Sequence, residues 1–178
     1  MTPPRARTWS RRGHTPVIRV RGRSRRRTPA AALCCYKPGE KSRLIHRPRN
    51  PLLLADACKS FSWQDSRDLL VRAHIQLGGP IAVVWDDLNT HLAAGPKRYE
   101  AKHDWLTTIR LPAYAPDLNP VEAVWSLVRG ATASTAFDTP DDLDRKLRRE
   151  IRRIQLRPHL IGGCLTSTGL AINPPTPP

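Results

Sequence analysis

The chain has 178 residues, of which 39% are hydrophobic and 18 are prolines, so we expect one domain with a modest core and irregular ends. Thirty Lys and Arg against fifteen Asp and Glu give a formal net charge of +15, which favours nucleic acid as a partner over a membrane or an acidic protein. No apolar run approaches the roughly 20 residues of a membrane-spanning helix, and no signal-peptide pattern is present. We therefore expect a soluble cytoplasmic protein, associated with the nucleoid.

Residues 1–29 form an arm rich in Pro and Arg, which holds ten arginines and no acidic residue. Two thirds of the net charge thus lies in the first sixth of the chain. Only residues 17–20 have the character of a strand. From composition alone, a solvated basic tail explains this segment as well as a DNA-binding arm does.

The next elements suggest a hairpin followed by a helix. Residues 30–36 predict a strand that ends at a Lys-Pro-Gly turn, and residues 42–47 return as its antiparallel partner. From Asp65, leucines and an alanine recur at helical spacing until the Gly78-Gly-Pro80 stop.

A strand–helix–strand unit follows. The unbroken apolar run 81–85 predicts a strand buried on both faces, hence parallel and central. Residues 99–105 predict a short helix and residues 107–111 another strand. This alternation is typical of an α/β layer with right-handed crossovers.

Two amphipathic helices complete the predicted domain, which spans residues 30–170. Asn119 is an N-cap before Pro120 at the first helical position, and apolar residues then follow at i, i+3, i+4 and i+7. A second helix begins near Pro140, with an apolar stripe opposed by Arg and Lys. The Pro-rich tail 171–178 is expected to fray.

The cysteines and histidines do not suggest a metal site of their own. The four cysteines lack paired spacing, and the adjacent Cys34 and Cys35 should point to opposite faces of a strand. We interpret them as reduced, mostly buried side chains. Because the six histidines are scattered along the sequence, we do not expect a zinc site.

Two acidic residues stand at positions typical of functional sites. Asp86 ends the apolar strand, and Glu122 lies in the first turn of the helix after Asn119. Open α/β sheets gather functional groups at the carboxyl ends of their strands, where two carboxylates can share a divalent metal. Each also has a structural explanation: Glu122 as a capping-box residue, and Asp86 with Asp87 as turn formers.

The sequence around both acids resembles DDE transposases of the mariner superfamily and its bacterial insertion-sequence relatives. The segment Val83-Val-Trp-Asp-Asp-Leu-Asn-Thr-His91 is similar to the block that contains the second catalytic aspartate of that family. Residues 111–125, Leu-Pro-Ala-Tyr-Ala-Pro-Asp-Leu-Asn-Pro-Val-Glu-Ala-Val-Trp, are similar to the block with the final acid. The resemblance covers about residues 9–170 and is much weaker outside the two blocks.

The resemblance implies an RNase H-like α/β fold, a mixed sheet flanked by helices, and DNA cleavage and strand transfer at transposon ends. Asp86 and Glu122 would be the second and third catalytic acids, which hold two Mg²⁺ or Mn²⁺ ions. Asp87 stands where asparagine is usual, and His91 matches a frequent histidine, so both are secondary candidates. In the arm, the residues expected to contact DNA phosphates are Arg19, Arg21, Arg23, Arg25, Arg26 and Arg27.

The family's first aspartate lies on a leading central strand, and because no acid occurs before Glu40 we expect this aspartate to be missing from the given sequence. We do not expect Asp56 or Asp65 to replace it, because neither ends such a strand. This leaves two hypotheses: a transposase catalytic domain, truncated and inactive unless an upstream segment completes it, or a non-catalytic basic DNA-binding remnant. Its partners would be transposon-end and target DNA and, in the complete form, a second copy of the chain.

Overall fold

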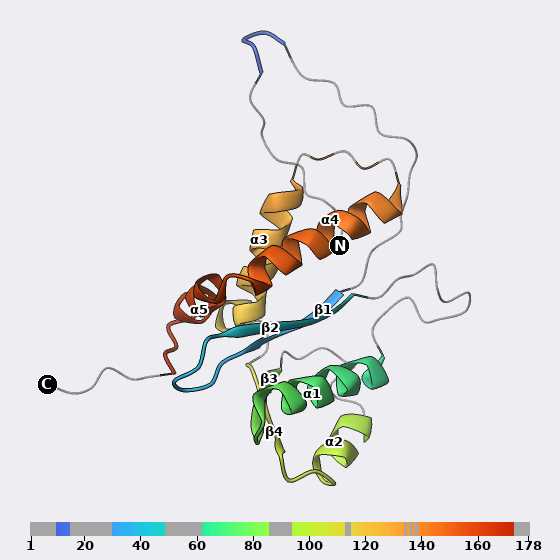
Figure 1. The fold of residues 1–178 in the computed structure, drawn as a ribbon, viewed down its shortest axis with the longest axis vertical. Coiled ribbons are helices and arrows are strands. Elements are labelled where there is room, and N and C mark those ends of the chain that lie inside the picture. The colour runs from blue at the N-terminus through green and yellow to red at the C-terminus, as the bar shows by residue number, and fades with distance from the viewer. Residues whose placement is uncertain are drawn as a thin grey trace, which may run out of the picture.

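The computed structural model describes residues 10–14, 30–48, 62–85, 94–112, 115–133, 135, 137 and 139–172. Within these residues the chain forms four strands, five α-helices and one 3-10 turn (Figure 1). In this part of the chain no helix is both long and apolar enough to cross a membrane.

The predicted hairpin is confirmed. β1 (Ala30–Cys35) pairs antiparallel with β2 (Arg43–Pro48). The connecting turn is closed by a bond from the Glu40 N–H to the Lys37 carbonyl, 3.1 Å long. Gly39 has φ 75° in this turn, a left-handed conformation that glycine adopts at little steric cost.

The first predicted helix is also confirmed. α1 (Trp63–Leu77) begins two residues before Asp65, because Ser62 is its N-cap. It ends at Gly78, which takes the left-handed C-cap conformation with φ 65°. Leu69, Leu70 and Ala73 form its buried stripe.

The parallel strand pair is present, but one face of it is open. β3 (Ile81–Trp85) pairs in parallel with β4 (Leu106–Arg110). Val83 is buried under α1, whereas Val84 is 49% and Ile109 50% exposed. The prediction that this strand is buried on both faces is therefore wrong for the described residues, where α1 covers one face and nothing covers the other.

The described strands form two separate two-stranded sheets rather than one mixed sheet. Each pair thus has unpaired outer edges in this part of the chain. Leu33 of β1 and Ile81 of β3 nevertheless pack in the same apolar cluster with Leu70, so the two sheets share one side of α1.

The helix predicted at residues 99–105 is misplaced. α2 spans Ala94–Glu100, and residues 101–105 form turns. The Glu100 carboxylate accepts the Thr108 N–H at 2.7 Å, which links the helix end to β4. Pro96 lies in the first turn of α2, where its missing N–H has no helical partner.

Three helices complete the described chain. The two predicted amphipathic helices are confirmed as α3 (Pro120–Thr132) and α4 (Pro140–Gln155). A short 3-10 turn, η2 (Pro116–Leu118), precedes α3. A last helix, α5 (Pro158–Thr166), was not predicted.

The hairpin lies between two helical layers. α3, α4 and α5 cover one face and α1 the other (Figure 1). Cys34 packs in the first layer and Cys35 in the second, so their predicted opposite orientation is confirmed. Burial raises the pKa of Cys34 to about 12 and that of Cys35 to about 11, which keeps both thiols protonated.

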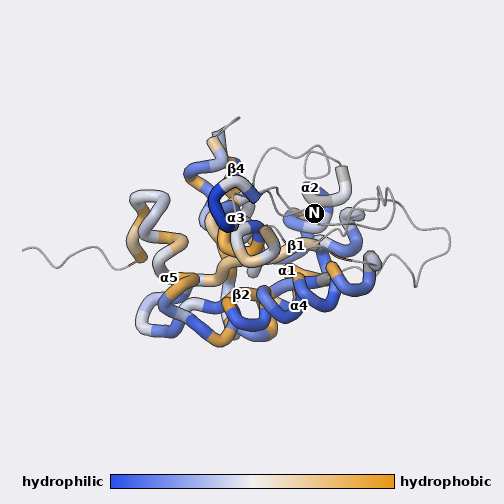
Figure 2. The backbone as a smooth tube through the Cα atoms, turned by 90° about the horizontal axis from the view of Figure 1, so that it is seen from above, coloured by the Kyte–Doolittle hydropathy of each residue, from blue (hydrophilic) through white to orange (hydrophobic). Residues whose placement is uncertain are grey.

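The largest apolar cluster joins the helices to the hairpin. Val124, Val128, Ile151 and Ile161 are at most 1% exposed within it. Figure 2 shows hydrophobic and hydrophilic positions alternating along α4, as expected for a helix with one buried stripe.

Candidate functional site

The carboxyl-terminal ends of β3 and β4 lie at the same end of the parallel pair. Trp85 is in register with Arg110, and the Trp85 carbonyl accepts the Leu111 N–H at 2.8 Å. Asp86 follows Trp85 directly in sequence. Asp86, Asp87 and His91 themselves lie outside the described residues, as do the arginines at 19–27 and Asp56, so their roles stay predictions.

The chain passes from β4 through η2 into α3 by a defined set of backbone bonds. The Asn119 N–H donates to the Pro116 carbonyl at 3.0 Å, and the Asn119 side-chain oxygen accepts the Val121 N–H at 3.2 Å. Pro120 occupies the first helical position, where its missing N–H needs no partner. This confirms Asn119 as N-cap and fixes Glu122 in the first turn of α3.

The Glu122 side chain is half-buried and makes no capping interaction with Asn119. The backbone N–H that a capping-box glutamate would accept is already bonded to Pro116. Within the described residues, Glu122 therefore does not fill the structural role that its position suggested.

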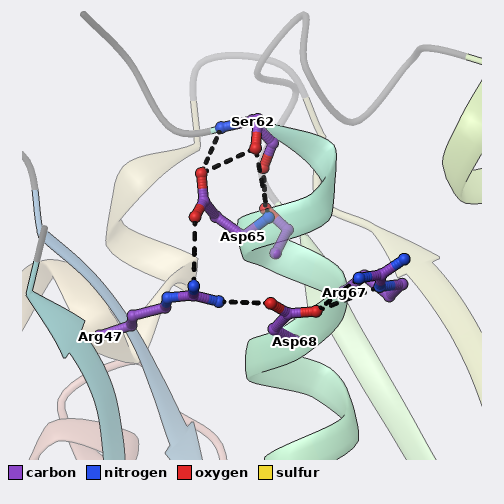
Figure 3. A network of polar contacts seen from close by, with 6 residues as sticks. Arg47, Ser62, Asp65, Arg67 and Asp68 are labelled. Carbon is purple, nitrogen blue, oxygen red and sulfur yellow. Dashed lines mark hydrogen bonds and ion pairs between the residues drawn. The ribbon is translucent and has the colours of Figure 1, made fainter. Parts of the chain in front are cut away.

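Two other helices of the same chain provide a comparison. In α1, Asp65 occupies the equivalent third position and accepts the backbone N–H of its cap Ser62 at 3.0 Å (Figure 3). In α4, Asp142 accepts the backbone N–H of its cap Thr139 at 3.1 Å. The acid at this position closes a capping box in α1 and α4 but not in α3.

Asp65 also belongs to an ion-pair network on the α1 side of the hairpin (Figure 3). Arg47 of β2 lies 3.6 Å from Asp65 and 2.8 Å from Asp68. Hydrogen bonds from Arg47 and Arg67 lower the pKa of Asp68. Asp65 is thus engaged in helix capping and in holding β2 against α1.

No group of three or more His, Cys, Asp or Glu side chains converges on one point among the described residues. Of the two predicted acids, the described residues include one, Glu122, whose carboxylate makes no capping bond. Carboxylate oxygens are the ligands that Mg²⁺ and Mn²⁺ prefer.

A second group of charged side chains was not predicted from the sequence. His46 of β2 lies among Arg72 of α1 and Arg148 and Arg152 of α4, and we name these four residues the β2-edge cluster. Burial lowers the pKa of His46, and the charges of the three arginines lower it further, while the nearby Gln155 side chain raises it. His46, Arg72 and the two arginines of α4 come from three elements far apart in sequence, so only the folded chain brings them together.

The described fold thus has a parallel strand pair, an antiparallel hairpin, and a helix whose first turn carries an acid not used as a cap. A family model described as DDE superfamily endonuclease matches residues 1–144. The chain belongs to this family.

Solved structures of mariner transposases share the fold. The Mos1 strand transfer complex is similar with a TM-score of 0.54 and 16% identity, over 96% of this chain and 52% of that chain. The Mos1 paired-end complex with the left transposon end has a TM-score of 0.55 and 17% identity, over 94% of this chain and 51% of that chain. The Mos1 mariner paired-end complex with Mn has a TM-score of 0.53 and 16% identity, over 95% of this chain and 52% of that chain.

The chain therefore spans about half the length of these transposase chains. These similarities confirm the predicted RNase H-like α/β fold, and the family model confirms the predicted DDE endonuclease family. A comparison with curated proteins found no match.

Proposed function

We propose that this chain contributes Asp86 and Glu122 to a transposase-type site that cleaves and rejoins DNA at insertion-sequence ends with Mg²⁺ or Mn²⁺. The observation that carries the proposal is Glu122. It occupies a capping-box position, is half-buried, and is not used as a cap, whereas Asp65 and Asp142 at equivalent positions are. A carboxylate in the first turn of the helix that follows a parallel strand pair in sequence, and spared from capping bonds, suits a metal ligand.

The residues around Glu122 position it. Asn119 and Pro120 fix the start of α3, so the carboxylate leaves the helix at a defined point. Asp86 would extend from the end of β3, with Asp87 and His91 as secondary ligands or outer-shell groups. When bound, divalent metal ions would supply the positive charge that phosphodiester cleavage requires. Arg19, Arg21, Arg23, Arg25, Arg26 and Arg27 would hold the DNA backbone.

A second function is favoured by the charge of the chain. Ten arginines without an acid in residues 1–29 suit DNA binding even where no cleavage occurs. In that case the chain is a basic DNA-binding remnant, whereas a complete transposase would act as a homodimer on transposon ends and target DNA. Metal binding distinguishes the two functions.

The test is a Mn²⁺ titration of the full chain, followed by electron paramagnetic resonance of free Mn²⁺. Asp86→Asn and Glu122→Gln should each weaken Mn²⁺ binding at least about tenfold. If both carboxylates hold the same ion, the double variant should lose little more than either single variant. Glu40→Gln is the matched control, because Glu40 pairs with Lys37 and Arg43 in the hairpin turn.

The same variants are then assayed for Mn²⁺-dependent nicking of supercoiled plasmid. Nicking that is lost in Glu122→Gln but kept in Glu40→Gln supports the transposase-type site. Wild-type protein that binds Mn²⁺ through both acids but does not nick indicates a site that needs a further carboxylate. Equal Mn²⁺ affinity in the wild type and in Glu122→Gln would refute the proposal and leave the DNA-binding remnant.

A further inference from the structure

The outer edge of β2 is flanked by arginines from two helices. Among the described strands β2 pairs only with β1, so its other edge carries no strand. α1 packs on one face of the hairpin and α4 on the other. Both helices direct positively charged residues toward this edge.

On α1, two hydrogen bonds locate Arg72. Arg47 of β2 donates to Asp68 at 2.8 Å, and Arg43 donates to the Gln76 carbonyl at 2.5 Å. Arg72 lies one helical turn from both Asp68 and Gln76, and residues four apart share a helix face. Arg72 is therefore placed along the middle of β2, and it is exposed.

On α4, a hydrogen bond from the Gln155 side chain to the Leu44 carbonyl, 2.7 Å long, ties the end of the helix to β2. Arg148, Arg152 and Gln155 follow the i, i+4, i+7 spacing of one helix face. Arg148 pairs with Asp144 at 2.6 Å. Arg152 contacts only the neutral Gln155 at 3.5 Å within the described chain.

His46 lies between Arg72 of α1 and the two arginines of α4, Arg148 and Arg152. Its Nδ1 atom is buried and has no hydrogen-bond partner among the described residues. One of the three surrounding arginines is neutralised by a carboxylate, and for Arg72 and Arg152 the described chain offers none. The β2-edge cluster thus has an excess of positive charge, which an anion would compensate.

We propose that the β2-edge cluster binds the phosphate backbone of double-stranded DNA. The proposal rests on DNA as the partner in the proposed function, but it concerns a second contact, built from other elements than the Asp86 and Glu122 site. Guanidinium groups match phosphate oxygens in bidentate geometry, and a row of them along an open edge can follow a backbone. Charge on an edge strand also prevents edge-to-edge pairing, which is the competing explanation.

The experiment measures DNA binding by the full chain with fluorescence anisotropy, using a duplex of about 20 base pairs in EDTA at several salt concentrations. The variant carries Arg72→Gln, Arg148→Gln and Arg152→Gln. Each phosphate contact contributes about 0.9 to the slope of log K against log salt, so the slope should fall by about 3. Binding at ~0.1 M salt should weaken at least about tenfold.

The control variant removes the same charge elsewhere, through Arg98→Gln, Arg129→Gln and Arg157→Gln, all at exposed positions. It should keep most of the wild-type slope. Equal losses in both triple variants would show that only net charge matters and would overturn the proposal. An unchanged slope in the cluster variant would leave edge protection as the role of the arginines.

Loss of the Arg148 and Asp144 pair could disturb α4. The double variant Arg72→Gln/Arg152→Gln keeps this pair, and its slope should fall by about 2. A double variant that folds normally and keeps the full slope contradicts the proposal. Because EDTA removes metal ions, the outcome does not depend on metal binding at the carboxylate site.

Discussion

The first prediction compares the acids at the third position of α1 and α3. Asp65→Ala removes a carboxylate that accepts the Ser62 N–H at 3.0 Å and the Ser62 hydroxyl at 2.7 Å and lies near Arg47. Glu122→Ala removes a carboxylate that bonds to no part of its cap. The two changes share helix position and charge, so their difference reports the capping bonds of Asp65 together with its ion pair to Arg47.

The magnitudes follow from these contacts. A hydrogen bond contributes about 0.5–1.5 kcal/mol net, and a partly exposed ion pair adds about 0.2–1 kcal/mol. Asp65→Ala should therefore lower the free energy of unfolding by about 2 kcal/mol. Glu122→Ala should change it by less than about 0.5 kcal/mol, mainly through the lost favourable charge at the helix N-terminus. Asp142→Ala, in α4, should resemble Asp65→Ala in direction.

The assay is urea unfolding followed by circular dichroism at 222 nm, with hydrogen exchange of the first-turn amides as a local measurement. Exchange should accelerate at the start of α1 in Asp65→Ala and stay unchanged at the start of α3 in Glu122→Ala. If Glu122→Ala costs as much as Asp65→Ala, Glu122 is a structural cap after all. The main support for the carboxylate site would then be lost.

Three further predictions concern the rest of the chain. Glu150 is 4% exposed. Burial alone would raise its pKa, but hydrogen bonds from Lys146 and Arg153 outweigh burial, and the pKa is lowered. The ionised Glu150 therefore stabilises the folded chain fully above the unfolded pKa of about 4.3, and this contribution is lost as the pH falls through the lower folded pKa. An acid titration should show this loss in the wild type and not in Glu150→Gln. Ile161→Ala should cost about 2–5 kcal/mol in urea unfolding, and the exposed Leu156→Ala less than about 0.5 kcal/mol. The open strand edges predict that the isolated chain aggregates on heating; a soluble, cooperative transition in light scattering and calorimetry would contradict this.

Local patterns were sufficient to predict most elements. The glycine after Leu77, the Asn119-Pro120 pair and the apolar stripe of α4 are signals that act within a few residues, and all three were confirmed. α5 was missed because it is short and contains the adjacent Gly162 and Gly163, which disfavour a helix. Its helix is held by tertiary contacts, including Ile161 in the core and the bond from the Tyr36 hydroxyl to the Ile161 carbonyl.

The carboxylate site and the β2-edge cluster could be predicted from the sequence to different extents. Glu122 was located from the sequence, but sequence could not decide between a cap and a ligand, because an acid three residues after an N-cap has the same pattern in both cases. Only the bond between Asn119 and Pro116 distinguishes them. The β2-edge cluster carries no sequence signal, since His46, Arg72 and Arg148 meet only when α1 and α4 pack on the hairpin.

The two proposed sites have opposite charge, and this is physically consistent with one DNA partner. Carboxylates such as Asp86 and Glu122 repel phosphates until metal ions neutralise them, so a site of this kind cannot by itself hold DNA at low metal concentration. Arginines at the arm and at the β2 edge can hold the backbone without metal, through contacts that salt weakens. DNA affinity should therefore depend on salt and on the arginines, whereas cleavage should depend on metal and on the carboxylates. The variants of the two sites separate these dependences.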